Sequence, residues 1–255
     1  LDLLLAGTGL RPRAAGTSII IEPAVGEVPP PTPDILVTGT RIRGAKVASP
    51  VITVTREGAR DAGQATLGEI VRSIPQSFGG GQNPGIGFNV PSSSGADSGG
   101  GSTINLRGLG SDATLTLLNG HRLSYGGTRQ AVDVSAIPLG AVDRIEIVAD
   151  GASALYGSDA VGGVANIILR PDMTGVETRA RIGGATEGGD FSQQYGVTAG
   201  SRWGSGGIIA AYEFNRTGAI DWNQRDYAID RSIGLRLLPS ARNHNVLLSA
   251  HQSFG

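Results

Sequence analysis

Two patterns of hydrophobic and polar residues divide the chain near Pro171. Before this proline, short β-prone runs alternate with short helix-like segments, which predicts a mixed α+β domain with a small sheet. After it, segments of about ten residues alternate apolar and polar positions with a period of two, as transmembrane β-strands do. The chain therefore combines two different architectures.

Local signals locate the elements of the first region. Thr66 and Glu69 form a capping box that begins a helix, and Asn119-Gly120 predicts a tight hairpin turn. The glycine-rich stretch 78–101 predicts a long loop. The other expected elements are strands over 51–54, 103–107, 114–118, 122–124, 144–149 and 164–169, and helices over 56–62, 66–73 and 152–156.

The second region contains five expected strands. In the third of them Ile208 and Tyr212 fall on one face while Glu213 and Asn215 fall on the other, as lipid-facing and lumen-facing residues would. Tight connections alternate with a long one, which is typical of outer-membrane barrels. The five ranges are 176–184, 193–203, 207–217, 231–238 and 245–253.

The N-terminal residues predict a separate small unit. Residues 1–6 read as the end of a helix, and 10–21 as a hairpin. The proline-rich stretch 25–33 cannot form a regular ladder and predicts an extended linker. The segment 34–39 that follows is β-prone but has no partner strand nearby in sequence.

Composition excludes several classes of function. The formal net charge of −1 gives no electrostatic basis for nucleic-acid binding, and the absence of cysteine excludes thiolate metal sites and thiol nucleophiles. No apolar run reaches the roughly 18 residues of a membrane-spanning helix. Gly108 to Ala113 match a dinucleotide fingerprint, but β-prone residues follow it where a helix is required. We expect no catalytic residues, no metal and no cofactor.

Two stretches carry a family resemblance: INLRGLGSDATLTLLNGHRL at 104–123 and IPLGAVDRIEIVADGASALYGSDAVGGVANIILR at 137–170. They are similar to the plug of TonB-dependent outer-membrane receptors, which has an Arg-Gly pair, an Asp/Asn-Gly turn, then RIEV, GxxSALYG and GGVINI elements. Many siderophore receptors of this family have Arg-Gly-Pro where this chain has Asp150-Gly151-Ala152.

The resemblance implies a domain plan. Residues 1–24 are the C-terminal part of a secretin/TonB short N-terminal domain, 25–33 a linker and 34–42 a TonB box. Residues 43–171 are an α+β plug domain, and 172–255 are the first strands of an incomplete transmembrane β-barrel, since a complete one has about 22 strands.

The resemblance also implies site residues. TonB would bind the box, consisting of Asp34, Ile35, Leu36, Val37, Thr38 and Gly39. The plug motif residues are Arg107, Gly108, Arg144, Glu146, Gly151, Tyr156, Gly157, Gly162 and Gly163. The charges among them, Arg107, Arg144 and Glu146, could lock the plug to charges of the barrel wall; the alternative is that they form a solvated face. Candidates for a ligand-facing loop are Phe78, Gln82, Asn83, Phe88 and Asn89.

The implied function is energised uptake of a scarce solute across the outer membrane of a Gram-negative bacterium. The plug would sit in the barrel lumen and the N-terminus in the periplasm. The implied partners are TonB with its inner-membrane energising complex, outer-membrane lipid, and a small solute such as a siderophore, a glycan or another nutrient. One alternative is a signalling receptor whose N-terminal domain contacts an anti-sigma regulator. Another is a periplasmic binding or adhesive module.

Overall fold

A computed structural model describes residues 10–15, 18–23, 49–80, 101–125, 131–228 and 236–254. The chain divides into two compact units, Leu1–Ile35 and Leu36–Gly255. In the first unit, β1 (Leu10–Ala15) pairs antiparallel with β2 (Ser18–Pro23), which is the expected hairpin. The expected helix end at 1–6, the linker and the whole of 34–39 lie outside the described residues.

A five-stranded mixed sheet forms the centre of the second unit, in the order β3-β6-β7-β4-β5. Strand β4 pairs parallel with β7, and the other neighbouring strands are antiparallel. The strands are β3 (Ile52–Thr55), β4 (Thr114–Leu118), β5 (His121–Arg122), β6 (Val142–Val148) and β7 (Gly163–Leu169). The turn between β4 and β5 places Asn119 and Gly120 at positive φ, as expected.

In the described part of this unit, three short α-helices accompany the sheet: α2 (Arg56–Asp61), α3 (Leu67–Ser73) and α4 (Ser153–Tyr156). At the start of α3 the Thr66 hydroxyl accepts a hydrogen bond from the Glu69 N–H at 3.1 Å. The Glu69 carboxylate accepts from the Ala65 N–H at 2.8 Å, one residue earlier than a standard capping box requires. The predicted helix therefore begins where its sequence signal lies.

Buried aliphatic side chains hold the helices to the sheet. Ile147, Ile167 and Val71 are fully buried in one cluster that joins β6, β7 and α3. Burying a side chain of this size stabilises the fold by roughly 1.5–3 kcal/mol. A smaller cluster around Leu115 and Val164 lies between β4, β7 and the segment that follows α4.

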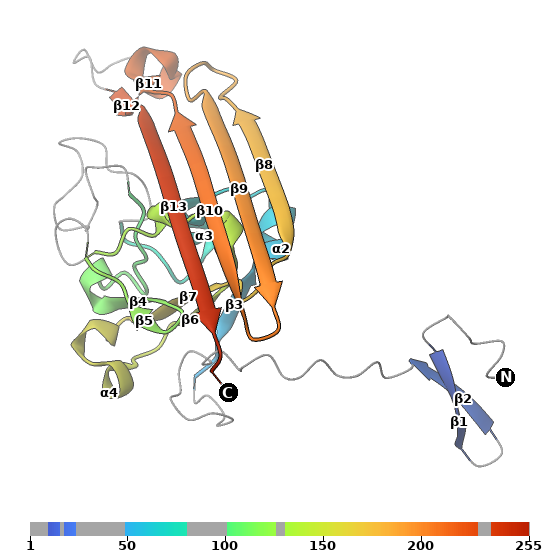
Figure 1. Ribbon diagram of the computed structural model, residues 1–255. Coiled ribbons are helices and arrows are strands. Elements are labelled where there is room, and N and C mark those ends of the chain that lie inside the picture. The colour runs from blue at the N-terminus through green and yellow to red at the C-terminus, as the bar shows by residue number, and fades with distance from the viewer. Residues whose placement is uncertain are drawn as a thin grey trace. The chain divides into compact units, whose positions relative to one another are not determined.

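The second region forms a four-stranded antiparallel sheet in the order β13-β10-β9-β8, and its strands run side by side in Figure 1. They are β8 (Gly175–Gly183), β9 (Ser192–Trp203), β10 (Gly206–Thr217) and β13 (Ala241–Gln252). In β10, Ile208 and Tyr212 are exposed while Ile209 and Glu213 are buried, which is the alternation that the sequence predicted.

Two expected strands differ from the structure. In the described part of 231–238, only β12 (Arg236–Leu238) is a strand; it pairs with β11 (Ile220–Asp221), while β13 pairs with β10 along its whole length. The segment 103–107 is buried up to Leu106 but joins no sheet; it makes an isolated bridge between Leu106 and Ser77. No helix among the described residues is long and apolar enough to cross a membrane.

Candidate functional site: the contact between the mixed sheet and the four strands

Ion pairs connect the α+β region to the first long strand. Glu177 on β8 accepts hydrogen bonds from Arg56 at 3.0 Å, to both carboxylate oxygens, and from Arg170 at 2.9 Å. The side chains of both arginines are largely covered, at 27% and 16% exposed, while that of Glu177 is 40% exposed. One carboxylate on the strand thus holds two cations that come from opposite ends of the α+β region.

A second ion pair lies four residues further along β8, on the same face of the strand. Arg181 donates to both carboxylate oxygens of Glu69, at 2.8 and 2.9 Å. Because Glu69 also accepts the Ala65 N–H at the start of α3, this pair connects the strand to the cap of a helix.

Hydrogen bonds to backbone atoms supply the buried part of the contact. Glu213 on β10 is 3% exposed and accepts the Leu139 N–H at 3.2 Å. Gln194 on β9 donates to the Ala65 carbonyl at 2.5 Å, and Asn245 on β13 donates to a backbone carbonyl at 2.8 Å. Polar groups buried in this way are costly to leave unpaired, so the contact is specific in position.

Close approach at one glycine adds a steric requirement. A Cβ on Gly140 would lie 2.1 Å from the Thr198 hydroxyl oxygen on β9 and 3.3 Å from the Arg179 guanidinium. Only glycine lets the turn Leu139–Ala141 pack against the strands at this distance.

Two of the predicted locking charges, Arg144 and Glu146, form an ion pair with each other. Arg144 on β6 donates to Asp143 at 2.7 Å and to Glu146 at 2.9 Å, all within the α+β region. Burial lowers the pKa of Arg144, but these two hydrogen bonds raise it overall. Arg56, Glu69 and Arg170 of the α+β region form ion pairs with strand β8. No local signal predicted the pairs of Arg56 and Glu69, because their partners on β8 lie more than 100 positions away in the sequence.

The Arg107-Gly108 pair lies close to Phe78, one of the candidates for a ligand-facing loop. Both residues have positive φ, 62° and 69°, and a Cβ on Gly108 would lie 2.7 Å from the ring of Phe78. Phe78 itself is 54% exposed. Asn105, which the sequence did not single out, fixes this corner by donating to the Gly80 carbonyl and accepting the Gly110 N–H. The other loop candidates, Gln82, Asn83, Phe88 and Asn89, lie outside the described residues.

The remaining motif residues shape the start of β7 and the turn around α4. Gly163 has a φ of 139°, and a Cβ there would lie 2.4 Å from the Val148 carbonyl oxygen. Gly162 donates its N–H to the Ala113 carbonyl at 2.7 Å. Tyr156 is partly buried against the smaller cluster, and Gly157 ends α4 at a φ of 91°. Gly151 has neither a positive φ nor a close neighbour. Gly157 and Gly163 thus adopt backbone conformations that favour glycine, whereas Gly151 has no such requirement.

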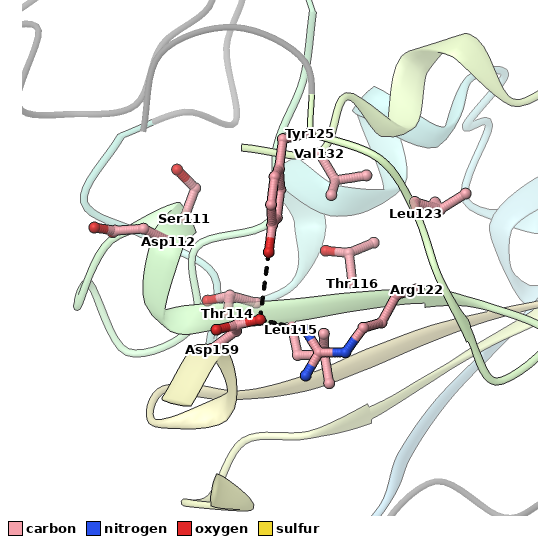
Figure 2. A pocket seen from close by; sticks show the side chains of 10 residues that line it. All are labelled: Ser111, Asp112, Thr114, Leu115, Thr116, Arg122, Leu123, Tyr125, Val132 and Asp159. Atoms are coloured by element: carbon pink, nitrogen blue, oxygen red, sulfur yellow. Dashed lines mark hydrogen bonds and ion pairs between the residues drawn. The ribbon is translucent and has the colours of Figure 1, made fainter. Parts of the chain in front are cut away.

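Figure 2 shows a small pocket beside the β4–β5 hairpin. Arg122 forms an ion pair with Asp159 and also donates to the Tyr156 carbonyl, while the Tyr125 hydroxyl lies 3.4 Å from Asp159. The hydrogen bond from Arg122 lowers the pKa of Asp159. The pocket has about 10 Å³ of space, close to what one water molecule needs. It is too small for a solute.

Known proteins share this architecture. Residues 43–164 match the family model of the TonB-dependent receptor plug domain. The siderophore receptor PirA from Pseudomonas aeruginosa is 22% identical with a TM-score of 0.50, and the match covers 82% of this chain and 32% of PirA. A mutant ferric enterobactin receptor from Pseudomonas aeruginosa, in complex with enterobactin, is 22% identical with a TM-score of 0.50 over 70% of this chain and 26% of that one. The chain thus spans about a quarter to a third of these proteins, and the likeness is one of fold.

Proposed function

This chain carries the plug domain of a TonB-dependent receptor, and from that premise we propose that it serves energised uptake of a scarce small solute across the outer membrane of a Gram-negative bacterium. The four-stranded sheet is the start of the barrel, and its inner face holds the plug in the lumen. The plug closes the pore until a bound solute and TonB act on it.

The observation that carries this proposal is the way the plug is held. Glu177 binds Arg56 and Arg170, and Arg181 binds Glu69, but these side chains remain partly exposed. Each such pair contributes only about 0.2–1 kcal/mol. The plug is thus positioned by many weak contacts and a few buried hydrogen bonds, so a moderate force can displace it.

The box at Asp34–Gly39 is the proposed attachment point for that force. A β-prone segment of this kind can be added as a strand to a partner's sheet through backbone hydrogen bonds. Binding of solute on the outer side shifts the equilibrium toward the state with a released box, and TonB then transmits force from the inner-membrane complex.

The proposed solute is a small nutrient such as a siderophore or a glycan. The siderophore and enterobactin receptors named above support the first option. Asp150, where many siderophore receptors have arginine, accepts hydrogen bonds from the Ser49 hydroxyl at 2.7 Å and the Gly151 N–H at 2.8 Å. The hydrogen bond from Ser49 lowers the pKa of Asp150, so this position carries a negative charge in place of a positive one.

Replacing Glu177 with alanine tests the closing role of the plug. The change leaves Arg56 and Arg170 without their shared partner, and we expect it to weaken docking by about 1–2 kcal/mol. That is roughly a five- to thirtyfold rise in the undocked population. In the intact receptor, cells should become more sensitive to a large antibiotic that the outer membrane normally excludes.

Glu57→Ala is the matched control, because Glu57 also faces Arg56, at 3.7 Å, but lies on the same helix and is 65% exposed. It should leave antibiotic sensitivity unchanged. Equal sensitivity in wild type and Glu177→Ala, at equal amounts of receptor in the outer membrane, would contradict the proposed plug closure.

A signalling role is a second candidate, favoured by the separate compact unit Leu1–Ile35 with its β1–β2 hairpin. Deleting residues 1–23 should then abolish solute-dependent transcription while leaving uptake intact. The two readouts are a reporter gene and labelled-solute accumulation in the same cells. Unchanged induction after the deletion would rule out this role.

A further inference from the structure

Two arginines face each other on the outward side of the four-stranded sheet. Arg216 on β10 and Arg242 on β13 are directly paired in the register, and both are exposed. They lie on the same face as Tyr212 and Phe214, opposite the face that contacts the plug. Like charges directly across two strands destabilise a sheet, so this arrangement calls for a counter-charge.

The described part of the chain provides no counter-charge for Arg216 or Arg242. Arg181 is paired with Glu69, Arg225 with Glu187, and Arg236 with Asp221. Neither Arg216 nor Arg242 forms an ion pair with any described carboxylate, although both lie near the end of the sheet where these other pairs are found.

An aromatic row lies next to the arginine pair. Tyr195, Phe214 and His244 are register partners across β9, β10 and β13, with ring centroids 6.1 Å apart for Tyr195–Phe214 and 4.9 Å apart for Phe214–His244. Tyr212 adds a hydroxyl 2.9 Å from the His244 ring nitrogen. Barrels carry such aromatic rows at the membrane interface, so the arginines, one step beyond Phe214 on the same face, lie at headgroup level.

An aromatic residue at the other end of the sheet supports the placement of the aromatic row at one membrane interface. Trp203 is exposed on the same strand as Tyr195, eight positions along. At about 3.4 Å per residue and a tilt near 40°, the two rings are about 21 Å apart along the membrane normal. This is close to the roughly 25 Å apolar band of such barrels.

The lengths of the connections between strands indicate which side of the membrane Arg216 and Arg242 face. Strands β9 and β10 are joined by the two-residue turn Gly204-Ser205, whereas the connection from β10 to β13 is long and contains β11 and β12 (Figure 1). Short turns are periplasmic and long loops extracellular in these barrels. The arginine pair therefore lies toward the outer leaflet.

We propose that Arg216 and Arg242 form a binding site for the phosphate of a phosphorylated lipid headgroup in the outer leaflet. Two guanidinium groups side by side can each donate to phosphate oxygens, and the aromatic row covers the adjoining acyl region of the same lipid. The site rests on the proposed outer-membrane location, but it makes no use of uptake.

The test measures lipid retention by the intact receptor in detergent, using native mass spectrometry with added lipid A and with dephosphorylated lipid A. Wild type should retain lipid A preferentially. The double variant Arg216→Gln/Arg242→Gln should lose this preference, with roughly thirtyfold weaker binding. Arg236→Gln, which removes one positive charge from an arginine already paired with Asp221, should behave as wild type.

Two outcomes would overturn the proposal. Equal lipid A retention by wild type and the double variant would show that the arginines do not bind it. Displacement of lipid A by millimolar inorganic phosphate would show a general anion site. Uptake assays on the same samples keep the transport function separate, since lipid retention does not depend on it.

Discussion

Replacing Leu36 with proline should reduce energised solute uptake by the intact receptor about tenfold or more, while binding of solute at the cell surface persists. Proline removes a backbone N–H and fixes φ, so it interrupts the hydrogen bonds through which a partner strand would pair with the box. Several lost bonds at about 1 kcal/mol each account for an effect of this size. The measurement is accumulation of labelled solute with and without a protonophore.

Leu36→Val is the control for this substitution, because valine keeps the N–H and has high β propensity. Its uptake should match that of wild type. If Leu36→Pro transported solute at the wild-type rate, the assignment of Asp34–Gly39 as the TonB-binding box would be wrong.

Replacing Gly163 with valine should prevent the plug from folding. A side chain at a φ of 139° is strained, and its Cβ would overlap the Val148 carbonyl oxygen on the neighbouring strand β6. Strain and overpacking together cost about 3 kcal/mol or more, a large fraction of the stability of a small domain. We expect rapid cleavage of the plug by added trypsin in isolated outer membranes.

Gly151→Ala provides the comparison at a glycine of the preceding plug motif, since the nearest atom to its added Cβ is 3.8 Å away and its φ is not positive. This variant should resist trypsin as wild type does. A protease-resistant Gly163→Val plug would show that the start of β7 can rearrange around a side chain.

Local signals predicted the elements that depend on neighbouring residues. The cap at Thr66 and the Asn119-Gly120 turn lie where their short-range chemistry places them, because each hydrogen bond or φ requirement is satisfied within a few positions. Alternation along β10 was also sufficient to separate its two faces.

Partners distant in sequence could not be predicted. Residues 231–238 contain the alternation of a strand, but β13 occupies the place beside β10, and alternation does not specify a partner. Segment 103–107 was expected to be a strand and is buried up to Leu106, yet Ser77 and Gln76 take part of its hydrogen bonding in place of a neighbouring strand. The contact of Glu177 with Arg56 had no local signal at all.

The pairing of the plug sheet also constrains the order in which this protein can assemble. Strand β3 finds its partner β6 only after some ninety residues have followed it, and such distant pairing slows folding. The last strand of that sheet, however, ends at Leu169, before β8 begins at Gly175. During synthesis, every strand of the plug sheet is therefore made before β8, the first strand of the four-stranded sheet. The plug needs no strand of the four-stranded sheet to complete its own.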